Sequence, residues 1–145
     1  ARFLQMLAPE MIKQGGGAIV GVGSVAGDRE RVGNYVYGAA KAGFATYLSG
    51  LRNALGREGV HVLTVKPGPV ETAMTAGLGK QPFMTTPEAV VDDIHKALRK
   101  KRNVLFTKLI WWPVMTVIKL IPEPIFKKMC SPMGSVKRIV LKNRL

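Results

Sequence analysis

Cysteine and histidine are scarce in this sequence of 145 residues, which contains one cysteine and two histidines. Because Cys130 is alone, no disulfide can form within the chain, and two separated histidines do not form a zinc site. The sequence therefore predicts a protein without a metal centre. It also favours a reducing, cytoplasmic setting.

Long hydrophobic runs are missing as well. The stretch Leu109–Ile118 has ten uncharged residues, whereas about 20 are needed to cross a bilayer. The first residues lack the charged, apolar and small-residue regions of a signal peptide. Since the chain opens at Ala1, inside a segment with helical periodicity, we expect the natural protein to begin further upstream.

Acidic residues are almost absent from the last third of the chain. The formal net charge is +13, and residues 96–145 hold 13 basic side chains against the single acidic residue Glu123. Residues 1–95 are nearly neutral, with 9 basic and 8 acidic side chains. The basicity therefore belongs to a tail rather than to a nucleic-acid-binding body, and we expect nucleic acid not to be the partner.

Hydrophobic periodicity predicts alternating helices and strands in the rest of the chain. Three strands are expected, the first of them fully buried, at Ala18–Val22, His61–Val65 and Val104–Thr107. Three helices are expected at Ala1–Ile12, Asn34–Leu55 and Pro87 to about Arg102. The first should pack through Phe3, Leu4, Leu7, Met11 and Ile12, and the third should be capped by Thr86. Strand, helix, strand order indicates an α/β fold with a parallel sheet.

Tyr37 and Lys41 are four residues apart on the predicted central helix, so their side chains share one face. A neighbouring ammonium favours the ionised form of a tyrosine and makes it a better proton exchanger near neutral pH. Ser24 follows the preceding strand, and Lys66-Pro67-Gly68-Pro69 ends the next one. Because parallel strands end at one edge of the sheet, where α/β folds bind ligands, these residues should meet there.

Three motifs carry a family resemblance: Gly23-Ser24-Val25-Ala26-Gly27, Tyr37-Gly38-Ala39-Ala40-Lys41 and Pro67-Gly68-Pro69-Val70-Glu71-Thr72. In order and spacing, residues 1–107 resemble the carboxy-terminal part of short-chain dehydrogenases/reductases. These enzymes have a doubly wound, Rossmann-like sheet and transfer a hydride between NAD or NADP and a carbonyl or alcohol carbon. The resemblance implies one partial catalytic domain, followed by a basic amphipathic tail at residues 108–145.

The resemblance also implies a role for each motif. Tyr37 would be the general acid or base, Ser24 would bind the substrate oxygen, and Lys41 would assist Tyr37. Tyr37 and Lys41 would also contact the cofactor, Lys41 by holding the nicotinamide ribose. Pro67, Gly68, Val70 and Thr72 would belong to a loop over the nicotinamide. The family's glycine-rich turn, its catalytic asparagine and the residue that separates NAD from NADP would all lie upstream of Ala1. The family's helical subunit interface implies a homo-oligomer.

The tail leaves several interpretations open. Trp111, Trp112 and Ile118 could cover the substrate pocket or a second subunit, or the tail could lie on an anionic membrane as short helices broken by prolines. Ser24–Arg29, Asn34–Tyr37 and Ile121–Pro124 are similar to decaprenylphosphoryl-2-keto-ribose reductases, which reduce a lipid-linked keto-sugar at the inner membrane face. The competing hypothesis is a catalytically incomplete fragment that acts as a membrane-surface or protein interaction module.

Overall fold

A computed structural model describes residues 2–29, 34–76, 79 and 81–130. Three parallel strands form one sheet in the order β1 (Gly17–Val22), β2 (Val60–Lys66) and β3 (Val104–Phe106). Gly17 lies opposite Val60 and Val22 opposite Val65, and β3 joins at Thr64, which lies opposite Val104. The predicted α/β fold with a parallel sheet is thus confirmed.

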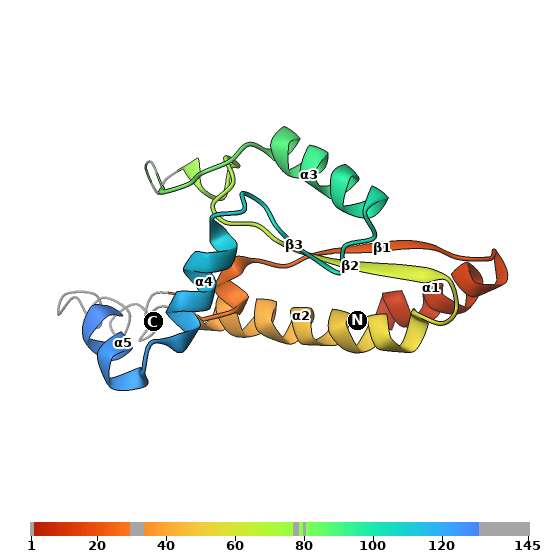
Figure 1. Cartoon of the computed structure of the whole chain (residues 1–145), viewed down its shortest axis with the longest axis horizontal. Coiled ribbons are helices and arrows are strands. Elements are labelled where there is room, and N and C mark those ends of the chain that lie inside the picture. The colour runs from red at the N-terminus through yellow and green to blue at the C-terminus, as the bar shows by residue number, and fades with distance from the viewer. Residues whose placement is uncertain (1, 30–33, 77–78, 80, 131–145) are drawn as a thin grey trace, which may run out of the picture.

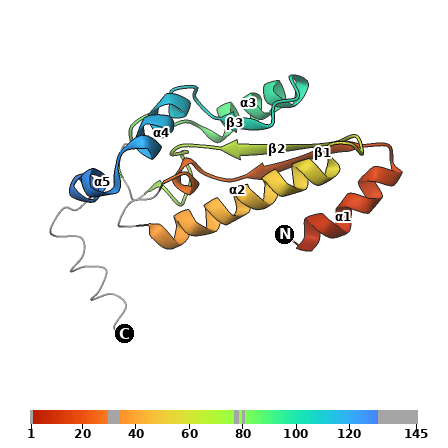
Figure 2. The ribbon, with the colours of Figure 1, turned by 60° about the horizontal axis from the view of Figure 1, so that its bottom comes forward.

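Helices cover both faces of the sheet. Helices α1 (Arg2–Lys13) and α2 (Tyr35–Leu55) lie on one face, and α3 (Pro87–Arg99) lies on the other (Figures 1 and 2). A short 3-10 helix, η1 (Val25–Gly27), follows β1. The tail forms α4 (Trp111–Leu120) and α5 (Glu123–Cys130), which lie beyond the carboxyl ends of the strands (Figure 1).

The strand β2 divides the core into two clusters, because its side chains alternate between the two faces. Val62 faces α2, where it packs with Ile19 and the fully buried Leu48. Leu63 and Val65 face the other way, toward α3. Full burial of such a side chain contributes roughly 1.5–3 kcal/mol, so these contacts fix both helix layers on the sheet.

Three expectations are corrected. Strand β1 is not fully buried, because Val20 and Val22 are 36% and 49% exposed, whereas α3 packs over β2 and β3. Helix α3 ends at Arg99 rather than near Arg102, and Lys101 then adopts a positive φ. Phe3 and Leu7 are 70% and 38% exposed and do not share the packed face of α1, where Leu4, Met11 and Ile12 lie. The Thr86 cap is confirmed, since its side chain accepts a hydrogen bond from the Ala89 N–H.

Candidate active site

Ser24 lies in a loop that is held against the end of β2. The Gly23 N–H donates to the Val65 carbonyl at 2.8 Å, and the Val25 N–H donates to the Pro67 carbonyl at 3.0 Å. The Ser24 Oγ accepts a hydrogen bond from the Ala26 N–H at 3.1 Å and so caps η1. The loop that follows β1 and the loop that follows β2 therefore share one sheet edge, as the sequence predicts.

Tyr37 and Lys41 occupy the first turns of α2, beside this loop. The Lys41 Nζ lies 5.6 Å from the centre of the Tyr37 ring and donates to the Val22 carbonyl at 3.2 Å. Gly27 brings η1 against α2, because a Cβ atom on Gly27 would lie 2.9 Å from the Lys41 carbonyl carbon. The absence of that atom lets the Ser24 loop pack directly on the helix that carries Tyr37.

The loop Pro67–Thr72 is fixed by contacts that the sequence analysis missed. The Thr85 N–H donates to the Pro69 carbonyl at 3.0 Å, and the Glu71 N–H donates to the Thr85 carbonyl at 2.9 Å. The Thr75 hydroxyl donates to the Val70 carbonyl at 2.6 Å and accepts from the Thr72 N–H at 3.0 Å. Thr85 is buried, so its hydrogen bonds hold the loop from the interior of the protein.

A buried ion pair joins the segment after η1 to the end of β2. The Lys66 ammonium donates to one carboxylate oxygen of Asp28, and only 15% and 7% of the two side chains are exposed. Within the described part of the chain, the second carboxylate oxygen has no hydrogen-bond partner. The sequence gives no local signal for this pair, because 38 residues separate its members.

A cavity of about 240 Å³ opens between these loops and the tail. Val25, Ala26 and Arg29 line it on the side of the Ser24 loop, while Trp111, Met115, Ile118 and Phe126 line it on the side of α4 and α5. Of the side chains predicted to cover the substrate pocket or a second subunit, Trp111 and Ile118 line this cavity. Trp112 does not line it and is 62% exposed.

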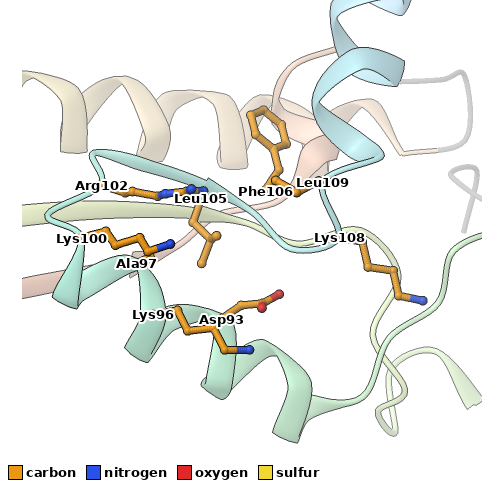
Figure 3. Close-up of a pocket in the computed structure, with 9 residues that line it drawn as sticks. All are labelled: Asp93, Lys96, Ala97, Lys100, Arg102, Leu105, Phe106, Lys108 and Leu109. Atoms are coloured by element: carbon orange, nitrogen blue, oxygen red, sulfur yellow. The ribbon is translucent and has the colours of Figure 1, made fainter.

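A second hollow, of about 220 Å³, lies between α3 and β3, and four of its nine lining residues are basic. Figure 3 shows Lys96 and Asp93 on α3, Lys100 just beyond its end, and Lys108 beyond the carboxyl end of β3. These four side chains are at least partly exposed. They form a solvated charged surface rather than an enclosed site.

The described helices include none that is both long and apolar enough to cross a membrane. The described residues also bring no three His, Cys, Asp or Glu side chains together as metal ligands. Among the described residues, the side chains predicted to carry chemistry at the sheet edge are the Tyr37 phenol, the Ser24 hydroxyl and the Lys41 ammonium. They lie beside the pair of Lys66 with Asp28 and the backbone groups of two loops.

Curated relatives match most of the chain. An uncharacterised oxidoreductase of Mycobacterium tuberculosis is 38% identical over 127 residues, covering 88% of this chain and 51% of that protein. An uncharacterised oxidoreductase of Streptomyces coelicolor is 34% identical over 122 residues, covering 81% of this chain and 46% of that protein. The chain thus spans about half the length of these relatives.

Solved structures share the fold. A short chain dehydrogenase from Burkholderia cenocepacia in complex with NADP matches with a TM-score of 0.76 at 21% identity, over 89% of this chain and 53% of that one. A short-chain dehydrogenase from Sphingobium yanoikuyae in complex with NADPH matches with a TM-score of 0.68 at 26% identity, over 84% and 52%. The family model for short chain dehydrogenases matches residues 2–82. This chain therefore belongs to the short chain dehydrogenase family.

Proposed function

We propose that the natural protein is an NAD(P)-dependent oxidoreductase that transfers a hydride between nicotinamide and a carbonyl or alcohol carbon. The observation that carries this proposal is the gathering of the Ser24 loop, Lys41 and Tyr37 at the carboxyl edge of a parallel sheet. Membership of a family of oxidoreductases supports it, as do the relatives described as oxidoreductases.

Each polar side chain has a distinct task in this proposal. In reduction, the Tyr37 phenol donates a proton to the carbonyl oxygen, and in oxidation its phenolate accepts that proton. The Ser24 hydroxyl donates a hydrogen bond to the same oxygen, which becomes negative as the carbon is reduced. The Lys41 ammonium lies 5.6 Å from the centre of the phenol ring, and its task is to assist Tyr37 and to hold the nicotinamide ribose.

The residues present fit the nicotinamide end of the cofactor. An ammonium at Lys41 suits the ribose hydroxyls, while the loop Pro67, Gly68, Val70 and Thr72 offers backbone groups and a hydroxyl to the carboxamide. Thr85 and Thr75 hold that loop in place. When bound, the cofactor supplies or takes the hydride. The related structures contain NADP and NADPH, and both NAD and NADP remain within the proposal.

Replacing Tyr37 tests the reaction. In the full-length protein, Tyr37→Phe should lower kcat/KM for a ketone by about 100- to 10,000-fold, which is the usual contribution of a general acid. Binding of NADPH, followed by its fluorescence, should be unchanged because the ring is kept.

Tyr35→Phe is the matched control. Tyr35 lies on the same turn of α2 and is 55% exposed, and it has no role in the proposed reaction. Its turnover should equal that of the wild type. Retained turnover in Tyr37→Phe would remove Tyr37 from the mechanism.

A narrower proposal concerns the substrate and the location of the protein. We propose a lipid-linked keto-sugar, reduced by a cytoplasmic protein that lies peripherally at the inner membrane face. The resemblance in Ser24–Arg29 and Ile121–Pro124 supports this substrate, as does the division into a catalytic part at residues 1–107 and a basic tail at residues 108–145. Residues 131–145 of that tail lie outside the described residues.

A second candidate function is an anionic membrane-surface module that does not itself catalyse. The observation that favours it is the outer surface of α4 and α5, where large apolar side chains are exposed beside lysines. Trp112, Val117, Leu120, Ile125 and Met129 are each more than half exposed. A vesicle-binding test of this surface is argued in the Discussion.

We further propose that the protein is a homo-oligomer. The exposed side chains of α1 support it, since Phe3 and Met6 are 70% and 71% exposed on a helix beside α2. Apolar side chains of this size are commonly covered by a partner when they gather on one surface.

A further inference from the structure

The ion pair of Asp28 and Lys66 lies next to both segments that carry site residues. Asp28 ends the 3-10 helix η1, because its N–H donates to the Val25 carbonyl at 3.0 Å. The Ser24 side chain caps the other end of η1. Asp28 and Ser24 are thus joined by a single short turn, so a shift of Asp28 also moves Ser24.

Lys66 has the same close relation to the second loop. It is the last residue of β2 and directly precedes Pro67. Its ammonium donates to the Asp28 carboxylate and lies 5.5 Å from the centre of the Phe106 ring on β3. Cations attract an aromatic ring at this distance. The Lys66 ammonium therefore connects the segment after β1 with the ends of β2 and β3.

The ion pair and the backbone hydrogen bonds hold opposite ends of η1. The Gly23 N–H donates to the end of β2 and the Val25 N–H donates to the Pro67 carbonyl, and these bonds fix the start of η1. The pair of Asp28 with Lys66 fixes its end. Because η1 is held at both ends, the Ser24 hydroxyl keeps its place relative to the loop that begins at Pro67.

Stability alone does not account for this pair. Taking two charges out of water is costly, and a buried ion pair repays that cost only when its other polar groups are satisfied. Within the described part of the chain, one carboxylate oxygen of Asp28 is buried and has no hydrogen-bond partner. Neutral side chains of similar size often stabilise a fold equally well. The directional contact of two charges, in contrast, sets one spacing between the segments that carry them.

We propose that Asp28 and Lys66 are positioning residues, which together set the place of the Ser24 hydroxyl relative to the loop Pro67–Thr72. The proposal rests on the proposed oxidoreductase function. In that reaction the Ser24 hydroxyl must meet the substrate oxygen while the hydride reaches the adjacent carbon, so the spacing of the two loops decides the rate. Asp28 and Lys66 act through Ser24 and not on the substrate.

Three variants of the full-length protein separate positioning from stability: Lys66→Met, Asp28→Asn and the double variant. Each single change leaves a buried charge without its partner and should lower the melting temperature as well as kcat. The double change leaves no unpaired charge, so much of the melting temperature should return. Its kcat for 4-phenyl-2-butanone, per NADPH-binding site, should stay about 10- to 100-fold below wild type, the scale of loss expected when a reacting group is misplaced.

The KM for NADPH should stay close to the wild-type value in the double variant, because Thr85 and Thr75 hold the loop Pro67–Thr72 from its other side. Lys66→Arg keeps a cation that pairs with a carboxylate and should restore part of kcat. The proposal is overturned if the double variant regains kcat together with its melting temperature, or if the loss lies in KM for NADPH and not in kcat.

Hydrogen exchange tests the positioning role without any turnover. In the double variant the amides of Gly23 and Val25 should exchange faster than in the wild type, while the amide of Val62, which is fully buried in β2, should not. Unchanged exchange at Gly23 and Val25 would overturn the positioning role even if no ketone is reduced. A wild-type protein that reduces no ketone would count only against the proposed function.

Lys13→Met is the matched control. Lys13 forms an ion pair with Glu10 at 2.9 Å, in which 71% and 61% of the two side chains are exposed. Exposed pairs of this kind contribute little to stability. The control should change neither kcat nor the exchange of the Gly23 and Val25 amides. If it lowers kcat as much as Lys66→Met does, the loss does not come from the buried pair.

Discussion

Gly21 lies where β1 passes over the buried side chain of Leu48. A Cβ atom at this position would lie 2.1 Å from the Leu48 Cδ1. Leu48 has no exposed surface and packs with Ile19 and Val62, so it has no space into which to move. A single hydrogen atom in place of a methyl group therefore sets how closely β1 and α2 approach, just before the strand reaches Ser24.

Gly21→Ala should consequently destabilise the protein by about 1–3 kcal/mol, the usual cost of overpacking a core. Denaturant unfolding of the full-length protein measures this change. Gly50→Ala is the control, because Gly50 lies on α2 with no atom within 4 Å of the added Cβ. That variant should be unchanged or stabilised by up to about 1 kcal/mol, since alanine favours helix. An equal change in the free energy of unfolding in Gly21→Ala and Gly50→Ala would contradict the close packing of Gly21 on Leu48.

At the scale of elements, β3 is shorter than β2, and the Arg52 side chain supplies hydrogen bonds where the two strands do not pair. Only Thr64, Val65 and Lys66 of β2 pair with β3. At the amino-terminal side of this pairing, the Arg52 guanidinium of α2 donates to the Val62 carbonyl at 2.8 Å, to the Thr64 hydroxyl at 2.6 Å and to the Asn103 carbonyl at 2.8 Å. Burial lowers the pKa of the Arg52 guanidinium, which nevertheless stays charged at neutral pH.

Arg52→Met should therefore cost about 1–3 kcal/mol in the free energy of unfolding, because it leaves backbone and hydroxyl groups without their partner while keeping the aliphatic stem. Hydrogen exchange should also become faster at the start of β2 and β3. Arg99→Met, at the exposed end of α3, is the comparison and should change stability little. If Arg52→Met lowers the free energy of unfolding no more than Arg99→Met does, then water replaces the hydrogen bonds of Arg52.

The elements that could be predicted are those whose pattern is local. Helix α2 begins one residue after the predicted start and ends at the predicted Leu55, and every strand end lies within one residue of its predicted position. The site motifs follow from the same alternation, because strand ends fix the position of Ser24 and Pro67. Thr85 and the pair of Asp28 with Lys66 could not be predicted, since partners distant in sequence leave no periodic signal.

The exposure of β1 could not be predicted from the hydrophobic pattern either. An apolar run indicates a strand that can be buried on both sides, but the neighbouring elements decide whether it is. Here Val20 and Val22 stay partly exposed because α3 packs over β2 and β3. The contacts of Arg29 with the tail are a similar case, since their partners lie about 90 residues away in the sequence.

At the scale of the whole molecule, the tail has two surfaces with different chemistry. Its inner side lines the cavity through Met115 and Phe126. Its outer side exposes Val117 and Leu120 at 61% and 76%, next to Lys119. Glu123, the one acidic residue after position 95, is engaged by Arg29. An apolar surface with uncompensated positive charge is complementary to an anionic membrane.

The full-length protein should therefore sediment with vesicles that contain phosphatidylglycerol, and less with phosphatidylcholine vesicles or at high salt, which screens the lysines. Val117→Ser with Leu120→Ser should weaken the binding by tenfold or more, since each large aliphatic side chain contributes roughly 1.5–3 kcal/mol on burial. Val91→Ser is the control, because Val91 is 50% exposed on α3, on the opposite face of the sheet from α2. Binding that is unaffected by the changes on α4 would assign this surface to another occupant, such as a second copy of the chain.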